Sequence, residues 1–155
     1  MNGSSWLTAG AVLAGLAVGL GAFAAHGLNE QFAIQYADAE PRKVAGVDIP
    51  ASLKYLQDFK TGAEYQMYHA LGMIGVGLLI RASKNRNRSL NAAGWSFLIG
   101  IIVFSGGLYL LTTTGQRWLG AIVPIGGVAF LVGWGCFAAG VCPCRNPESC
   151  SPQEN

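Results

Sequence analysis

The sequence predicts an all-α protein that crosses a lipid bilayer four times as a transmembrane bundle, and three observations support this fold class. Hydrophobic residues make up 52% of the 155 residues, charged residues make up 12%, and the apolar residues fall into four blocks. About a quarter of the residues in a typical soluble domain are charged. We therefore favour four transmembrane helices over four buried helices of a soluble protein.

The predicted spans cover about residues 6–28, 64–80, 92–111 and 119–141. A helix needs roughly 20 apolar residues to cross a hydrocarbon core of about 30 Å. Three blocks reach this length, and the shorter second block is bracketed by Glu64 and Arg81. Residues 22–24 resemble a signal-peptide cleavage site, but no Lys or Arg precedes the apolar stretch, which favours an uncleaved helix.

The spans are expected to form one domain over residues 1–141, followed by a flexible cytoplasmic tail over residues 142–155. One short loop carries Arg81, Lys84, Arg86 and Arg88 and no acidic residue. Short loops rich in Lys and Arg face the cytoplasm. We therefore predict a multi-pass protein of the bacterial inner membrane with both termini in the cytoplasm, and topology explains these charges without a nucleic-acid partner.

The long first loop is predicted to lie outside the membrane and to be irregular as far as Pro50, since it shows no sustained periodicity. After Pro50, Leu53, Leu56 and Phe59 recur at every third residue between polar and charged residues. This pattern predicts a short amphipathic helix in the membrane interface. Gly62 is then expected to bend the chain into the second span.

Glycines recur at helical spacing in the predicted spans and are expected to form packing faces. Small residues let helix backbones approach closely in lipid, where hydrophobic burial no longer drives association. The glycines assigned to packing are Gly15, Gly19, Gly106, Gly107, Gly126, Gly127 and Gly133. The pattern predicts contact with lipid and with helices, whether of this chain, of a second copy or of another membrane subunit.

Polar side chains gather near the predicted outer end of the bundle. They are His26, Glu64, Tyr65, Gln66, Tyr68, His69 and Tyr109. Ionisable residues inside a membrane are costly unless they are paired, so they are usually structural partners or functional groups. We predict that His26 and His69 approach each other across the first two spans.

Two functions are compatible with this cluster. One is a non-enzymatic structural or assembly component of a membrane complex or homo-oligomer, in which the polar groups hydrogen-bond neighbouring helices. The other is a small transporter or proton-linked channel, because an imidazole titrates near neutral pH. Catalysis is not expected, since the sequence has no phosphate-binding loop, dinucleotide fingerprint or Ser-His-Asp arrangement at recognisable spacing.

We expect no cofactor and no metal. Cys142, Cys144 and Cys150 are weak candidates, because three thiolates can bind a soft metal. Their spacing lacks the paired C-x-x-C of structural zinc sites, and a cytoplasmic tail keeps thiols reduced.

Four segments occur in an order that identifies a resemblance: residues 21–28, residues 65–71 with Tyr-Gln-Met-Tyr-His, residues 105–109, and residues 124–127 followed by Gly133-Trp134. Together they resemble the small bacterial membrane proteins typified by YgdD. The resemblance implies a four-helix inner-membrane protein without an established activity, with His26 and His69 at the family's histidine positions. This chain differs in its longer first loop, around residues 33–50, and in its Cys-bearing tail.

Overall fold

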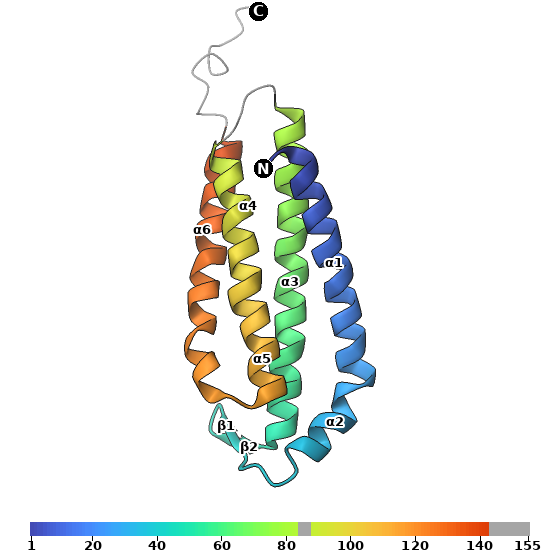
Figure 1. The fold of residues 1–155 in the computed structure, drawn as a ribbon. Helices are drawn as coiled ribbons and strands as arrows, with labels where there is room; N and C mark the ends of the chain where they lie inside the picture. Colours follow the sequence, from blue (N-terminus) through green and yellow to red (C-terminus); the bar gives the residue numbers. More distant parts are fainter. Residues whose placement is uncertain (84–87, 143–155) are drawn as a thin grey trace, which may run out of the picture.

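The computed structural model describes residues 1–83 and 88–142, in which long helices run side by side (Figure 1). In chain order the elements are α1 (Gly3–His26), α2 (Leu28–Gln35), β1 (Arg42–Val44), β2 (Val47–Ile49), α3 (Ala51–Ala82), α4 (Arg88–Gly100), the π-helix η1 (Ile101–Ser105), α5 (Gly106–Thr114), the 3-10 helix η2 (Arg117–Ala121) and α6 (Val123–Val141). Helices α4, η1 and α5 follow one another without a break and form one continuous rod.

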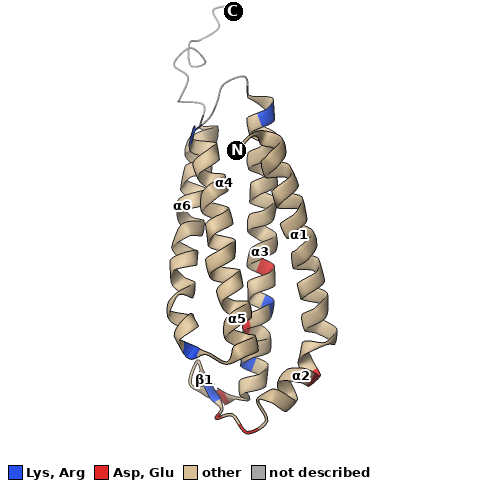
Figure 2. Ribbon diagram, in the orientation of Figure 1, with Lys and Arg blue, Asp and Glu red and all other residues tan. Residues whose placement is uncertain are grey.

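Within residues 1–83 and 88–142, three helical segments are long and apolar enough to cross a membrane: Gly3–His26, Arg88–Thr114 and Arg117–Val141. They correspond to the first, third and fourth predicted spans. Helix α3 has 32 residues but is more polar, because Lys54, Asp58, Lys60 and Glu64 interrupt its first half. Charged residues otherwise occur mainly in the hairpin and near the two ends of the molecule (Figure 2).

The helices pack in the order α1, α3, the α4–α5 rod and α6, with α1 and α6 at opposite flanks (Figure 1). At its beginning α1 also reaches α4, where the fully buried Trp6 contacts Gly94 and donates its Nε1–H to Asn91 over 3.1 Å. In each of these three segments we compared the most apolar stretch of 18 residues. In that stretch 17% of the residues are buried for α1, 17% for the segment that ends in α6, and 39% for the α4–α5 rod. Only a small share of the residues in the two flanking helices is therefore buried within the chain.

The contact between α1 and α3 is a close approach of two backbones. A Cβ added to Gly10 would lie 2.8 Å from the Ala70 carbonyl oxygen, and one added to Gly77 would lie 2.7 Å from the Gly3 carbonyl oxygen. The small residues of α1 that are buried at this contact recur every seven positions: Gly3, Gly10, Ala17 and Ala24. Only glycine fits at the tightest of these positions without moving the backbone.

Gly15 and Gly19, for which the sequence left the packing partner open, make no close contact within the described part of the chain. A Cβ at either position would meet nothing within 4 Å. Successive residues of a helix are about 100° apart, which turns this pair to the side of α1 opposite Gly10 and Ala17. The GxxxG face therefore points away from α3.

The glycines of α5 and α6 that were assigned to packing divide into tight and loose contacts. A Cβ on Gly126 would lie 2.5 Å from the Phe104 backbone nitrogen, and one on Gly133 would lie 2.6 Å from the Phe97 ring. A Cβ added to Gly107 would lie 3.2 Å from the Val123 side chain. One added to Gly106 or Gly127 would have its nearest neighbour at 4.0 Å, which is an ordinary contact distance. Gly126 and Gly133 therefore allow Phe104 and Phe97 of the α4–α5 rod to pack closely against α6.

The prediction of a separate interfacial helix ending at Gly62 is wrong. Helix α3 runs unbroken from Ala51 to Ala82, so the amphipathic segment and the second span are one helix. Gly62 is buried, and its added Cβ would lie 3.0 Å from the Tyr109 ring. The glycine is needed for close packing against α5 and does not bend the chain.

The first loop is ordered, contrary to the irregular path expected of it. Leu28 and Phe32, each 1% exposed, anchor α2 in a cluster with α3 residues. Strands β1 and β2 form an antiparallel hairpin in which Val44 pairs with Val47. The intervening Ala45 and Gly46 have φ of 50° and 86°, the left-handed pair that a two-residue hairpin turn requires.

Substitution of Gly10, which faces α3, and of Gly15, on the opposite side of α1, tests the close contact between α1 and α3. We expect Gly10→Ala to lower the free energy of unfolding by about 1–3 kcal/mol, because its methyl group overlaps the α3 backbone. Gly15→Ala is the matched control and should be neutral or stabilising by up to about 1 kcal/mol through helix propensity. Thermal unfolding in mild detergent measures both, and equal midpoints for the two variants would contradict the assigned contact face.

Candidate functional site

Gln66 joins three helices through its side-chain amide. It lies on α3 and is 4% exposed. Its Nε2 donates to the Leu13 carbonyl oxygen of α1 over 2.8 Å, and its Oε1 accepts the Tyr109 hydroxyl of α5 over 3.0 Å. An unpaired buried amide would be costly in an apolar interior, so this residue holds the helices in one register.

His69 lies one turn further along α3 and is 5% exposed. Its Nδ1 is 2.7 Å from the Tyr65 carbonyl oxygen. Because a carbonyl oxygen only accepts, Nδ1 carries the proton in this bond. The imidazole stacks on Phe130 of α6, with ring centroids 3.4 Å apart and an interplanar angle of 8°, and Phe97 lies 5.6 Å away. The ring thus connects α3 to α6 inside an aromatic layer.

The π-helix η1 ends at a buried hydroxyl that sequence analysis did not single out. Ser105 is 0% exposed, and its Oγ has no hydrogen-bond partner among the described residues. The Gly106 N–H bonds to the Ile101 carbonyl, five residues back, which is the π-helical pattern. Such turns often mark functional positions in helices. Ser105 precedes Tyr109 by one turn, so it extends the polar set on this rod.

We call Gln66, His69, Ser105 and Tyr109 the polar seam. The other predicted members lie outside it. Tyr65 is 39% exposed and stacks on Phe104, with ring centroids 4.8 Å apart, while Glu64 and Tyr68 are exposed. The sequence therefore predicted three of the four seam residues but not which neighbouring polar residues point outward.

The predicted approach of His26 to His69 is wrong. Gly10 packs on Ala70, so His69 lies near the level of Gly10 on α1. The stretch of α1 from Gly10 to His26 is about 24 Å long at a rise of roughly 1.5 Å per residue. His26 is exposed at the last turn of α1, and the antiparallel register keeps the two imidazoles apart.

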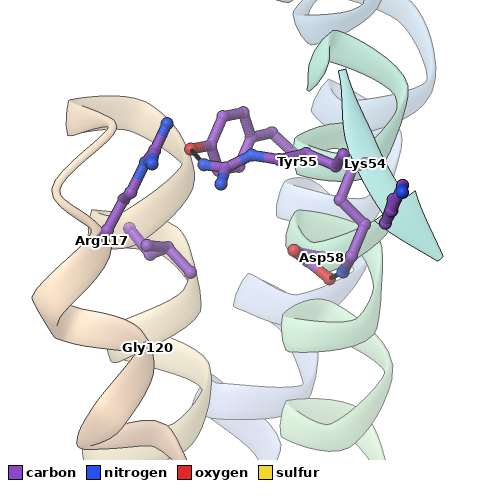
Figure 3. Close-up of a pocket in the computed structure, with 8 residues that line it drawn as sticks. Lys54, Tyr55, Asp58, Arg117 and Gly120 are labelled. Atoms are coloured by element: carbon purple, nitrogen blue, oxygen red, sulfur yellow. Dashed lines mark hydrogen bonds and ion pairs between the residues drawn. The ribbon is translucent and has the colours of Figure 1, made fainter. Parts of the chain in front are cut away.

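A second polar site was missed by sequence reasoning. A cavity of about 370 Å³ at the hairpin end is lined by Arg42, Lys43, Lys54, Tyr55, Asp58, Leu111, Arg117 and Gly120 (Figure 3). These residues come from β1, α3 and η2 and from the last part of α5. The only sequence signal was the adjacent pair Arg42-Lys43, and nothing in the sequence placed it beside Arg117.

The described residues contain no group of three His, Cys, Asp or Glu side chains that could hold a metal ion. Cys142 is exposed just after α6, whereas Cys144 and Cys150 lie outside the described residues. The expectation for the tail therefore remains a prediction.

Comparisons with known proteins place this architecture among membrane proteins without an assigned activity. The family model described as "Protein of unknown function (DUF423)" matches residues 20–127. The chain is 45% identical over 125 residues to the UPF0382 membrane protein YwdK of Bacillus subtilis, which covers 81% of this chain and 85% of that protein. It is 41% identical over 125 residues to a UPF0382 membrane protein of Staphylococcus saprophyticus, covering 81% and 86% of the two chains. No solved structure matches the chain.

Removal of the hydrogen bonds of Gln66 tests whether the polar seam stabilises the fold. Interhelical hydrogen bonds in membranes are worth about 0.6 kcal/mol on average. We expect Tyr109→Phe to lower stability by about this amount and Gln66→Leu by more, because Gln66 makes two such bonds. The double variant should lose less than the sum, since the two side chains share one bond.

Tyr68→Phe is the matched control, because Tyr68 is 55% exposed. Thermal unfolding in detergent should leave this variant unchanged. A loss on Tyr68→Phe equal to that on Tyr109→Phe would show that the Gln66–Tyr109 bond contributes nothing specific.

Proposed function

Since this chain belongs to the DUF423 family of membrane proteins of unknown function, we propose that it is a non-enzymatic membrane component that assembles with a second copy of itself through α1. The observation that carries the proposal is the uncovered GxxxG face of α1. Gly15 and Gly19 have open space where a side chain would begin. The face is therefore available to a helix outside the chain.

The position of α1 at one flank of the helix bundle supports this proposal. Helix α1 packs mainly on α3, so the side that bears Gly15 and Gly19 has no helix of the chain against it. Two helices related by a two-fold axis present the same patch to each other, which a GxxxG pair favours by allowing close backbone contact. Another membrane subunit could use the same face, and the experiment below separates the two partners.

The rival function is a proton-linked transporter built on His69. The buried imidazole favours it, and so does the Ser105 hydroxyl, which has no hydrogen-bond partner in the described part of the chain. Against it, His69 is packed between aromatic rings, and neither histidine lines the cavities found at the hairpin, under the first loop or beside α1. The packing supports a structural role for the seam more than a proton path.

The proposed membrane arrangement has four crossings, with both termini in the cytoplasm and α3 as the additional span. Helix α3 contains 32 residues, about 48 Å at a rise of 1.5 Å per residue, so it is longer than a hydrocarbon core of about 30 Å. Its most polar span residues, Gln66 and His69, are covered by neighbouring helices. A helix shielded in this way tolerates polar side chains that lipid would not.

Cysteine labelling tests the fourth crossing. In a background with the native cysteines replaced by serine, Val47→Cys marks the hairpin and Ala82→Cys marks the end of α3; both positions are exposed. We expect a membrane-impermeant maleimide to label the first in intact spheroplasts and the second only after permeabilisation. Equal labelling of the two variants in intact spheroplasts would show that α3 does not cross the bilayer.

Cross-linking tests the proposed contact between copies. In the same background, Ala22→Cys lies on the face of Gly15 and Gly19, and the nearby Ala25→Cys, also exposed but turned about 100° away from that face, is the matched control. We expect oxidation in native membranes to join two copies through the first position at least several times faster than through the second. Two differently tagged copies should also co-purify in mild detergent.

Bulky substitutions separate this contact from chance collision. Gly15→Leu with Gly19→Leu should abolish both signals, because the side chains hold the backbones apart. Gly135→Leu is the control on α6, since a Cβ there also meets nothing within 4 Å. If the double variant cross-links like the parent, the contact does not use this face; if only a different protein co-purifies, the partner is another subunit.

A further inference from the structure

The cavity at the hairpin end brings together cations that are far apart in the sequence. Arg42 and Lys43 come from β1, Lys54 from α3 and Arg117 from η2. Figure 3 shows Arg117 on one wall and the Lys54–Asp58 pair of α3 on the opposite wall, with the Tyr55 side chain extending from α3 toward Arg117. The volume of about 370 Å³ lies within the usual range of small-molecule sites.

The charge of the cavity lining is strongly positive. Its four basic residues face one carboxylate, Asp58, which forms an ion pair with Lys54. Within the part of the chain that the structure describes, Arg42, Lys43 and Arg117 make no ion pair. Asp48 is opposite Lys43 in the hairpin register, yet no ion pair joins the two. Three positive charges at the cavity are thus left without a carboxylate.

Contacts within the chain hold the Arg42 side chain in place at the cavity. The Arg42 Nη2 donates to the Tyr55 hydroxyl, and the guanidinium carbon lies 5.4 Å from the Tyr55 ring centroid. Tyr55 is 6% exposed and packs on Tyr36, with ring centroids 4.4 Å apart. Burial raises the pKa of Tyr36, Tyr55 adds to the rise and Arg42 opposes it. Tyr36 is therefore a neutral hydroxyl at physiological pH and donates to the Thr112 carbonyl over 2.7 Å.

We propose that this cavity binds a phosphate group, carried either by the headgroup of an anionic phospholipid or by free phosphate. Guanidinium groups present several N–H donors in a planar fork that fits phosphate oxygens, and lysines add point charges. The remaining lining supplies an apolar side: Leu111 is half-buried, and Gly120 has open space where a side chain would begin. Basic pockets beside transmembrane helices recognise lipid headgroups in this way.

The neighbourhood of the cavity suits a lipid headgroup. Trp118 follows Arg117 directly and is 61% exposed, and tryptophan is the residue enriched at the level of the headgroups. In this arrangement an acyl chain leaves the cavity past the half-buried, apolar Leu111. Free phosphate would need the same cations without this exit, so the two sources can be separated by experiment.

Native mass spectrometry of the full chain in mild detergent tests the proposal. The probes are phosphatidylglycerol, phosphatidylcholine and inorganic phosphate, each added to the delipidated protein. We expect phosphatidylglycerol to be retained in preference to the zwitterionic lipid. The triple variant Arg42→Gln/Lys43→Gln/Arg117→Gln should bind it about a hundredfold more weakly, from the usual contribution of each basic residue near a membrane surface.

Arg81→Gln is the matched control, because Arg81 is exposed at the opposite end of α3 and should leave binding unchanged. If the triple variant unfolds, Arg117→Glu replaces it, since this exposed residue is not needed for packing. A thermal shift by inorganic phosphate that also displaces phosphatidylglycerol assigns the site to free phosphate; lipid retention without such a shift assigns it to the headgroup. Binding that is equal in the parent and in these variants would overturn the proposal.

Discussion

The backbone contact between α1 and α3 is the constraint on which the rest of the structure depends. Gly10 and Gly77 remove the side chains that would separate the two helices, so each approaches carbonyl oxygens of the other. This contact sets a single antiparallel register. The register brings the Leu13 carbonyl to the Gln66 amide and leaves His26 far from His69. It also decides which side of α1 faces outward, because a helix that buries one stripe must expose the opposite one.

The central place of α3 follows from that contact and explains its composition. With α1 on one side and the α4–α5 rod on the other, α3 buries Gln66 and His69 where each finds a polar or aromatic partner. A helix in contact with lipid could not carry them at similar cost. Shielding by protein thus accounts for Gln66 and His69, whereas Lys60 and Glu64, which also lower the hydropathy of α3, are exposed.

The apolar spans could be predicted from the sequence because their signal is local: length and hydropathy alone marked α1, the α4–α5 rod and α6. The contact faces could not. Gly15-x-x-x-Gly19 is a stronger local motif than the seven-residue spacing of Gly3, Gly10, Ala17 and Ala24, yet the latter makes the intramolecular contact. Gly62 was interpreted as a bend because glycine weakens helices, whereas its reason is the Tyr109 ring on another helix. Each error concerns a residue whose role is set by a partner distant in the sequence.

The candidate sites show the same division between local and long-range signals. Gln66, His69 and Tyr109 could be identified because polar residues in an apolar block are rare, whereas the burial of Ser105 is a property of the assembled helices. The basic cavity depends on how the first loop is tied to the end of α5. The Gln35 amide donates to the Thr113 carbonyl over 3.0 Å, and the Tyr36 hydroxyl donates to the Thr112 carbonyl. The last carbonyls of a helix lack partners within it, so the loop stabilises α5 by supplying donors.

These two hydrogen bonds also have a consequence for charge. By fastening the segment before β1 to the end of α5, they hold Arg42 beside Tyr55 and on the same cavity as Arg117. Bringing like charges together is unfavourable, and the short strands of the hairpin cannot supply the energy alone. The favourable free energy that offsets this repulsion comes from burial of Phe32 and Tyr55, which are 1% and 6% exposed on the inner side of the loop. The cations are thus kept close by packing energy, and an anion that enters the cavity relieves their repulsion.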